Sequence, residues 1–442
     1  MKGEKPTTIV IVGASGDLTR KKLIPALFSL YCNGLMPDDF SVIGFARSKK
    51  SDKEFREDIS TNLTSRFEPE PEICDIRIGS FLKCSHYFSG QYGEPDAFNK
   101  LAEEFPEIRE EDRNLLVYLA IPPSVFFDTV HSLGASGIAD EKRNAWSRVV
   151  VEKPFGRDSA SSQKLTETLA QVYDEERTYR IDHYLGKEVI QNLLILRFAN
   201  LIFEPIWNRN YIDRVTITFS EDIGVEGRAG YFDSFGIIRD VMQNHLLQMV
   251  ALTAMEPPNT LGAYEIAQEK AKVLRAIEPL TVDNVVTGQY EGYLDDPEVP
   301  EDSTTETFAR ATLQVRNARW SGVPFHLMAG KALASRKTEI EIEFRYLPYS
   351  IFRDVGFENN TLRIRVQPNE SIELLVNNKR PGLGLDISQV SLNMLYHREF
   401  SEQLPEAYER LLLDVLRGER ALFIQHEELA AAWDLVTPLL HR

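Results

Sequence analysis

The chain has 442 residues, of which 43% are hydrophobic and 26% are charged, and this composition is ordinary for a soluble globular protein of two or three domains. Its net charge of −17 argues against nucleic acids and anionic membranes as partners, and no apolar run is long enough for a transmembrane helix. The three cysteines, Cys32, Cys74 and Cys84, are too few for a disulfide framework and indicate a reducing compartment, so we expect a cytoplasmic protein.

In the first third of the chain, short apolar runs alternate with segments of helical periodicity. The first predicted helix is capped by Asp17 and stopped by Gly34, and Pro25 within it is expected to cause a kink. Strands separated by helices predict a doubly wound, Rossmann-type α/β domain, which we assign to residues 1–180. Its predicted strands are residues 8–12, 41–45, 115–121 and 149–151.

The rest of the chain has a different pattern. Residues 180–201 and 232–252 have helical periodicity, and the acidic, proline-containing segment 294–306 is expected to be an exposed loop. Period-two alternation with one polar face predicts antiparallel strands. We therefore expect residues 181–442 to form an α+β domain with a large, mostly antiparallel sheet covered by helices on one face. The predicted strands are residues 215–219, 308–315, 339–344 and 362–366.

A glycine-containing turn connects the first predicted strand to the first predicted helix. It has the sequence Gly13-Ala14-Ser15-Gly16-Asp17-Leu18. Glycines in such a turn let the backbone approach a pyrophosphate, which binds at the helix N-terminus. The spacing differs from G-x-G-x-x-G, so an ordinary tight turn between a strand and a helix remains an alternative interpretation.

The end of the second predicted strand adds a second indication. Enzymes that bind NAD usually place an acidic residue there to bind the ribose 2′-hydroxyl. This chain has no acid there but has Arg47, Lys49 and Lys50. A guanidinium pairs bidentately with a phosphate, so Arg47 favours NADP, which carries a 2′-phosphate, over NAD. A solvated basic turn is the alternative.

Residues 180–188, Arg-Ile-Asp-His-Tyr-Leu-Gly-Lys-Glu, place an acid, an imidazole, a phenol and an ammonium in one short segment. An anionic sugar phosphate needs such donors, and a general base needs such a carboxylate to orient it. The segment resembles the signature of glucose-6-phosphate dehydrogenases, the NADP-linked enzymes that open the pentose phosphate pathway. Further matches to this family extend from about residue 8 to residue 441.

The resemblance implies which residues carry the chemistry. On a helical wheel His245 shares an arc with Ile238, Met242 and other apolar residues, which is typical of a core histidine. In the family, however, the histidine of Gln-Asn-His-Leu is the catalytic base, here His245, and Asp182 orients it. Lys153 matches a lysine that lies between substrate and nicotinamide, and Pro154 after it is a candidate for a cis peptide bond.

The implied reaction oxidises β-D-glucose 6-phosphate with NADP⁺ to 6-phospho-D-glucono-1,5-lactone, and it requires no metal. Each implied cation, taken singly, is more often a surface charge, but a cluster around a shared anion suits an acidic protein that binds anions. The implied substrate-binding residues are His183, Tyr184, Lys187, Glu221, Asp240, Lys331, Arg336 and Gln367. The implied cofactor-binding residues are Gly13, Ala14, Ser15, Gly16, Asp17, Leu18, Arg47, Ala120, Pro122, Pro123 and Lys153.

Two departures from the family pattern concern a second nucleotide. Many eukaryotic members bind a structural NADP at the α+β domain with basic residues and a C-terminal tail. Arg336, Lys337 and Arg365 match some of these contacts, but Met328 stands where those members have arginine, and the chain stops at Arg442, where they continue. We therefore expect this second site to be absent or weak. The early stop also fits a chain excised from a fusion with a lactonase, although no segment resembles a lactonase.

The resemblance also implies a homodimer or homotetramer formed through the broad sheet, and it leaves two other functions to consider. Sugar dehydrogenases of the Gfo/Idh/MocA type also carry Glu-Lys-Pro after a nucleotide fold, but a neutral sugar needs no cluster of cations. A non-catalytic NADP-binding regulator is expected to have lost Lys153, Asp182 or His245, and this chain keeps all three.

Overall fold

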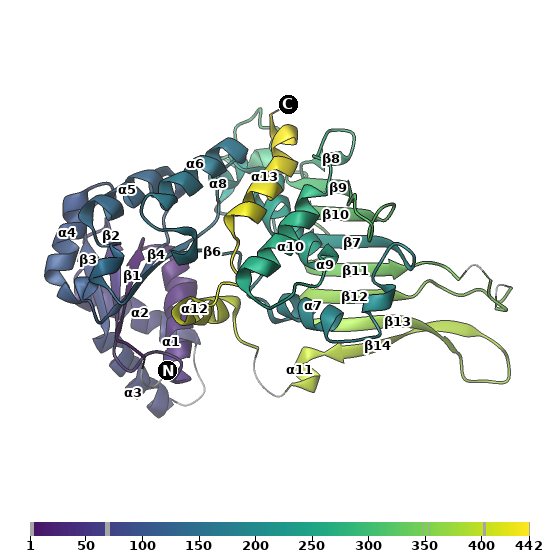
Figure 1. The fold of residues 1–442 in the computed structure, drawn as a ribbon, viewed down its shortest axis with the longest axis horizontal. Coiled ribbons are helices and arrows are strands. Elements are labelled where there is room, and N and C mark those ends of the chain that lie inside the picture. Colours follow the sequence, from purple (N-terminus) through teal and green to yellow (C-terminus); the bar gives the residue numbers. More distant parts are fainter. Residues whose placement is uncertain (1–3, 67–70, 348, 353, 401–403, 442) are drawn as a thin grey trace. The chain divides into compact units, whose positions relative to one another are not determined.

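The computed structural model describes residues 4–66, 71–347, 349–352, 354–400 and 404–441, and the chain forms two compact units (Figure 1). The first unit is built from the chain up to Gly156, from Ala160–Gly186 and from Pro405–His426. The second unit holds Lys187–Leu404 and most of the remaining residues. The units thus change at Gly186–Lys187 and not at the predicted residue 180, and a late segment of the chain also belongs to the first unit.

The first unit is a doubly wound α/β domain, as predicted. Among the described residues, six parallel strands form one sheet in the order β3-β2-β1-β4-β5-β6. The strands β3 and β6 were not predicted, because β3 has only two apolar residues, Tyr87 and Phe88, between polar ones and β6 has three residues. The strands are β1 (Thr7–Val12), β2 (Phe40–Ala46), β3 (Ser85–Ser89), β4 (Asn114–Leu119), β5 (Trp146–Val151) and β6 (Thr178–Arg180).

Helices cover both faces of this sheet, which explains the continuous apolar runs of its strands. Ile9, Ile11 and Val42 join a core that contains residues of α1, α2, α3 and α12. On the other face, the ring of Phe45 packs edge to face on Phe98 of α4, with centroids 4.8 Å apart. The helices are α1 (Ile24–Cys32), α2 (Asp52–Arg66), α3 (Pro71–Lys83), α4 (Pro95–Glu104), α5 (Phe126–Ser136), α6 (Ser159–Ala170) and α12 (Ala407–Arg417).

The first helix begins differently from the prediction. Asp17 is already helical and does not cap it, because the carbonyl of Gly16 accepts the backbone N–H of Arg20 at 3.2 Å. A π-helix, η1 (Thr19–Leu23), follows directly, and α1 continues it from Ile24. Pro25 has no backbone N–H to donate to the preceding turn, which explains why the irregularity lies there.

The second unit contains the large, mostly antiparallel sheet that was predicted. Its described residues form eight strands in the order β14-β13-β12-β11-β7-β10-β9-β8, in which β7 and β10 pair in parallel. Figure 1 shows α7 (Glu188–Phe198), α9 (Leu247–Ala254), α10 (Ala263–Arg275) and α13 (His426–Leu440) on one face of it. The strands are β7 (Ile212–Ser220), β8 (Val285–Gly288), β9 (Phe308–Gln314), β10 (Pro324–Gly330), β11 (Lys337–Phe344), β12 (Thr361–Gln367), β13 (Ser371–Lys379) and β14 (Ile387–Leu395).

Both long helical predictions in this half are wrong in detail. The helix α7 begins at Glu188 and not at residue 180, because the carboxylate of Asp182 accepts the backbone N–H of Tyr184 at 2.9 Å and forms a turn. The segment 232–252 is broken at Gly236, whose φ is +73°. It contains the end of α8 (Ala229–Asp233), then a π-helix, η7 (Ile238–Leu246), and most of α9. None of the helices in the described part of the chain has the length and apolarity to span a bilayer.

A buried ion pair ties α13 to α10 in the second unit. The ammonium of Lys270 lies 2.6 Å from the carboxylate of Glu428, and both side chains are almost completely buried. The buried amide of Gln248 in α9 accepts a hydrogen bond from Lys270 and donates one to Glu428, each at 3.1 Å. The three groups satisfy one another, so removal of one leaves a buried charge without its partner.

We expect the Lys270→Met variant to lose about 3–5 kcal/mol of unfolding free energy, because it strands the charge of Glu428. The matched control is Lys272→Ala in the same helix, because Lys272 forms an exposed pair with Glu269 that contributes at most about 1 kcal/mol. Chemical denaturation followed by circular dichroism measures both losses. Equal losses in the two variants would contradict the assignment of a structural role to the buried pair.

Candidate active site

The predicted nucleotide turn follows β1, which pairs with β4 at the centre of the sheet. The chain leaves the carboxyl ends of these two strands toward opposite faces of the sheet. Gly13 donates its backbone N–H to the carbonyl of Phe45 at 2.8 Å, and Gly16 donates to the carbonyl of Gly13 at 3.0 Å. Gly13 has a φ of +97°, and a Cβ at this position would lie 2.1 Å from the carbonyl oxygen of Ala120. The turn therefore lies against the segment with Ala120, Pro122 and Pro123, at the crevice where doubly wound sheets bind nucleotides.

The charged residues near this turn are partly neutralised by one another. Asp17 forms ion pairs with Arg20 at 2.6 Å and Lys21 at 2.8 Å, and the hydrogen bond from Lys21 is the main cause of the lowered pKa of its carboxyl group. Lys50 pairs with Asp58. The guanidinium of Arg47 lies over the ring of Tyr92, 5.3 Å from its centroid. Ala14, Ser15 and Lys50 are among the residues that line a small cavity next to the turn.

We expect Gly13→Ala to weaken nucleotide binding and to destabilise the protein, because the added methyl group meets a backbone carbonyl. The matched control is Gly34→Ala, which has a φ of +67° but nothing within 4 Å of the added Cβ, so it suffers only the backbone strain of about 1–2 kcal/mol. Thermal unfolding with and without dinucleotide separates the two effects. A Gly13→Ala variant that behaves like Gly34→Ala would contradict the close approach seen in the structure.

The candidate chemical residues of the first unit follow β5 and β6. Lys153 comes directly after β5 and Glu152, and the Lys153–Pro154 bond is cis, as the sequence indicated. Asp182 is buried just after β6. The ring of His183 packs edge to face on Tyr184, with centroids 5.0 Å apart.

A buried network next to these residues was missed by the sequence analysis. The hydroxyl groups of Tyr118 and Tyr408 both donate to the same carboxylate oxygen of Glu152, at 2.5 Å and 3.1 Å. Burial raises the pKa of Glu152, and the two hydroxyl donors partly offset this effect. The ring of Tyr408 in α12 also stacks on His183, with centroids 6.3 Å apart. A distant part of the chain thus supports the ring of a predicted substrate ligand.

In the second unit, four predicted substrate residues lie at one edge of the sheet. β7 and β10 are parallel, with their last residues in register, so Glu221 and Lys331 follow at the same edge. The ammonium of Lys331 lies 2.6 Å from the carboxylate of Glu221. Arg336 precedes β11, which starts opposite the end of β7, and Gln367 ends β12 opposite Thr338 of β11.

The π-helix η7 packs against β7 and β10 and presents Asp240 and His245. Hydrogen bonds in a π-helix run between residues five apart, so these two residues lie on the same side, whereas an α-helix would place them about 140° apart. The imidazole of His245 is buried and stacks on Phe219 of β7, with centroids 6.3 Å apart. The apolar residues that the helical wheel grouped with His245, among them Ile238 and Met242, are buried as His245 is.

The nine-residue motif is divided between the two units. Asp182, His183 and Tyr184 belong to the first unit, and Lys187 belongs to the second. Lys187 immediately precedes α7, and its carbonyl accepts the backbone N–H groups of Ile190 and Gln191 at 3.0 Å and 3.1 Å.

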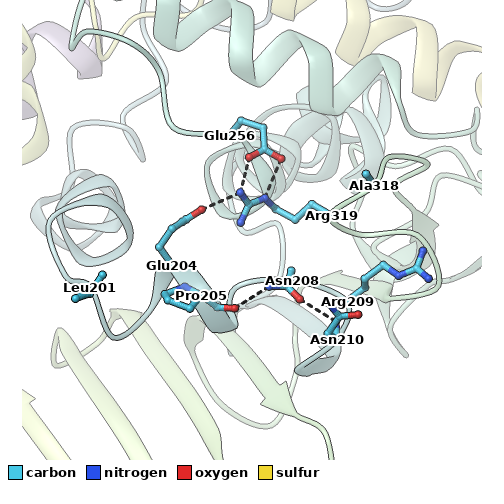
Figure 2. A pocket seen from close by; sticks show the side chains of 9 residues that line it. All are labelled: Leu201, Glu204, Pro205, Asn208, Arg209, Asn210, Glu256, Ala318 and Arg319. Atoms are coloured by element: carbon cyan, nitrogen blue, oxygen red, sulfur yellow. Dashed lines mark hydrogen bonds and ion pairs between the residues drawn. The ribbon is translucent and has the colours of Figure 1, made fainter.

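A separate pocket of about 600 Å³ in the second unit contains none of the predicted site residues. Figure 2 shows that the guanidinium of Arg319 in this pocket points at two carboxylates. It forms ion pairs with Glu204 at 2.8 Å and Glu256 at 2.5 Å, which use much of its hydrogen-bonding capacity. The guanidinium of Arg319 is therefore already paired, and we assign this pocket no role.

These features define a class of protein. A parallel sheet with a glycine turn at its switch point forms a dinucleotide-binding unit, and the second unit offers an imidazole, carboxylates and cations at one sheet edge. The class is that of two-domain, dinucleotide-dependent oxidoreductases.

Comparisons with known proteins narrow this class to one family. Models for the NAD binding domain and the C-terminal domain of glucose-6-phosphate dehydrogenase match residues 10–192 and 194–442. The chain is 50% identical to glucose-6-phosphate 1-dehydrogenase 1, chloroplastic, of Arabidopsis thaliana, over 99% of this chain and 78% of that protein. It is 45% identical to glucose-6-phosphate 1-dehydrogenase 6, cytoplasmic, of the same plant, over 98% and 85%.

A solved structure gives the same result. It is described as glucose-6-phosphate dehydrogenase in complex with its substrate glucose-6-phosphate, and it matches with a TM-score of 0.91 and 42% identity over 99% of this chain and 91% of that chain. The chain therefore belongs to the glucose-6-phosphate dehydrogenase family, which confirms the family predicted from the sequence.

Proposed function

We propose that this protein oxidises D-glucose 6-phosphate to 6-phospho-D-glucono-1,5-lactone with NADP⁺, releasing NADPH and a proton. The observation that carries the proposal is the match of both family models along nearly the whole chain. The nucleotide turn and the sheet edge of the second unit support it with suitable chemical groups.

On this proposal, NADP binds at the glycine turn of the first unit. The close approach of Gly13 to the backbone of Ala120 supports a turn shaped for a pyrophosphate. Arg47 binds the 2′-phosphate, since no acid follows β2 to bind a free 2′-hydroxyl. The proposed contacts are Gly13, Ala14, Ser15, Gly16, Asp17, Leu18, Arg47, Ala120, Pro122, Pro123 and Lys153.

The sugar phosphate is bound by cations and by hydrogen-bonding groups. His183, Tyr184 and Lys187 hold the phosphate, while Glu221 and Asp240 accept hydrogen bonds from sugar hydroxyls. The pairing of Glu221 with Lys331 supports a polar site, because both groups are held in place before the substrate binds. Lys331, Arg336 and Gln367 complete the proposed substrate contacts.

The chemistry needs a base, an orienting acid and a hydride acceptor. His245 takes the proton of the C1 hydroxyl while hydride leaves C1, and Asp182 orients the imidazole and stabilises its positive charge. NADP⁺ supplies the hydride acceptor. The ammonium of Lys153 stabilises the reacting oxygen.

The direct test is the initial rate of absorbance change at 340 nm with glucose 6-phosphate or glucose, each with NADP⁺ or NAD⁺. We expect rapid reduction with the phosphorylated sugar and a preference for NADP⁺. Comparable rates with NAD⁺ would remove the role of Arg47 in cofactor choice. Activity on free glucose alone would contradict glucose 6-phosphate as the substrate. NADP binding without turnover would favour the alternative of a non-catalytic NADP-binding regulator.

Changing His245 to Asn is expected to lower kcat by about 10²–10⁴-fold, because a general base contributes this much. KM for glucose 6-phosphate is expected to change little, since the base acts in the transition state. His397, an exposed histidine, gives the control variant His397→Asn. Steady-state kinetics of the two variants test the assignment of His245 as the base. Parallel losses in kcat and in substrate binding would indicate structural damage instead.

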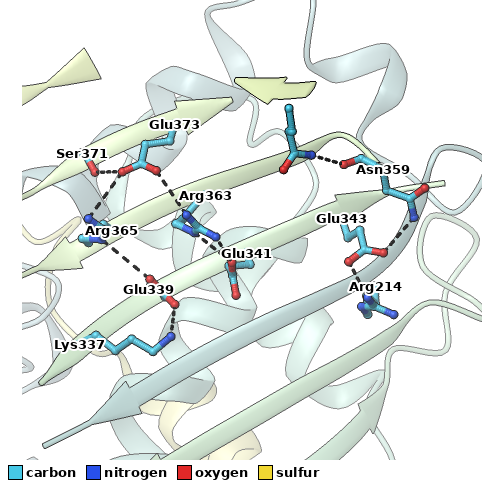
Figure 3. Close-up of polar contacts among 11 residues, drawn as sticks. Arg214, Lys337, Glu339, Glu341, Glu343, Asn359, Arg363, Arg365, Ser371 and Glu373 are labelled. Atoms are coloured by element: carbon cyan, nitrogen blue, oxygen red, sulfur yellow. Dashed lines mark hydrogen bonds and ion pairs between the residues drawn. The ribbon is translucent and has the colours of Figure 1, made fainter. Parts of the chain in front are cut away.

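The residues that match the second, structural NADP site of the family include Lys337 and Arg365, and carboxylates lie close to both of them. On β11, β12 and β13, cations alternate with carboxylates across the strands (Figure 3). Lys337 pairs with Glu339 at 2.5 Å, and Arg365 lies 3.9 Å from the same carboxylate. Arg365 also lies 3.6 Å from Glu373. These carboxylates oppose the binding of a phosphate, which supports the proposal that a structural NADP site is absent or weak.

We therefore expect one NADP per chain in a calorimetric titration of the folded protein. Charge neutralisation by Glu339 and Glu373 is the physical reason, since a nucleotide phosphate would have to displace both of them. The control is the Gly13→Ala variant, in which we expect this one binding event to weaken. A second binding event that survives in Gly13→Ala would overturn the prediction.

For location and assembly we propose a cytoplasmic homodimer or homotetramer. The relatives include both chloroplastic and cytoplasmic proteins, and the cytoplasmic ones support a cytoplasmic location. Val390 and Leu392 on the edge strand β14 are exposed apolar residues, which supports association through this strand. Light scattering after size-exclusion chromatography tests the assembly, and a monomer at micromolar concentration would overturn it.

A further inference from the structure

Glu306 lies at the start of the π-helix η7. Its backbone carbonyl accepts the N–H of Ile237 at 2.9 Å, and its carboxylate accepts the N–H of Ile238 at 3.1 Å. These N–H groups stand at the N-terminus of the helix, where no preceding turn offers them a carbonyl. A carboxylate is also favoured there by the helix dipole. Glu306 thus holds the first turn of η7 with its main chain and its side chain.

Gly236 allows this contact. A Cβ at this residue would lie 2.3 Å from a carboxylate oxygen of Glu306, so only glycine leaves room for the carboxylate at this place. Burial raises the pKa of the Glu306 carboxyl, and the hydrogen bonds from its own backbone and from Ile238 and the nearby charge of Arg239 act in the opposite direction. Two of these groups, Ile238 and Arg239, belong to η7, so the contact is specific in position.

The residue after Glu306 holds another part of the same region. The carbonyl of Thr307 accepts the backbone N–H of Lys331 at 3.0 Å, and Thr307 donates its own N–H to the carbonyl of Gly288 at 2.9 Å. Two consecutive residues thus fix η7, which carries His245, and the strand end that carries Lys331. The sequence had assigned Glu306 to an exposed acidic loop.

We propose that Glu306 is a positioning residue for the reaction: it fixes the start of η7 and thereby the place of Asp240 and His245. The inference rests on the proposed function, because it acts through the base assigned there. Displacement of a reacting group by about 1 Å can lower a rate about 100-fold, so a shift of this helix has a measurable effect.

The experiment compares three variants of Glu306 with the matched control Glu301→Ala, an exposed acid of the same segment. Glu306→Ala removes the side-chain acceptor, and we expect kcat to fall at least about 10-fold while KM for NADP⁺ stays within about twofold. Glu306→Gln keeps an oxygen acceptor and is expected to retain kcat within about threefold. Glu301→Ala is expected to match the parent protein.

A second variant tests the proposal if the first one does not fold. If Glu306→Ala does not fold, the comparison uses Glu306→Asp, in which the carboxylate is one methylene shorter and withdraws from the N–H of Ile238. A slow Asp variant beside an active Gln variant supports the proposal. A folded Ala or Asp variant with kcat within twofold of the parent would overturn it, as would a loss of kcat that only follows the loss of folded protein.

A double-mutant cycle with His245→Asn shows whether the effect passes through the base. We expect Glu306→Ala to slow the His245→Asn variant by less than about threefold, because the imidazole that it positions is already absent. The same fold-loss in both backgrounds would overturn the route through His245. A normal rate of His245→Asn would overturn the role proposed for His245, whereas a normal rate of Glu306→Ala beside a slow His245→Asn would overturn only the positioning role.

Discussion

The hydrogen-bond register of the π-helix η7 decides which side chains the second unit presents. Bonds between residues five apart bring Asp240 and His245 to one side, and the stack on Phe219 places the imidazole against β7. The same strand leads to Glu221 at the sheet edge. An α-helical register over these residues would rotate Asp240 away from His245. The chemistry proposed for this unit therefore depends on a backbone feature as much as on residue types.

The sequence predicted the parallel sheet better than the antiparallel one, for a physical reason. Strands buried on both faces, such as β1 and β4, are continuous apolar runs, whereas β14 is exposed along most of its length and has no such run. The π-helix could not be predicted from the sequence. Hydrophobic periodicity shows which residues are apolar, but it does not show which carbonyl accepts each backbone N–H. Gly236 was the available sign that residues 232–252 do not form one helix.

The candidate site shows a similar division. The turn at Gly13 could be predicted, because closely spaced glycines after an apolar strand have a local backbone cause. The stack of Tyr408 on His183 could not, since it joins residues far apart in the chain. Glu306 was assigned to a loop because its neighbours are acidic, and only the fold shows that its carboxylate meets the start of a helix. Residue types indicate a chemistry, and long-range packing decides which of them are held in place.

The first unit is not a continuous stretch of chain, and this has a consequence for its biosynthesis. Leu411, Leu412 and Val415 of α12 complete the apolar core around α1, although nearly the whole second unit is encoded between them. As the polypeptide leaves the ribosome, the apolar face of α1 that α12 covers stays exposed until α12 is synthesised. Chaperone capture of this nascent intermediate, more than the speed of local folding, is then expected to govern the yield of native enzyme in the cell.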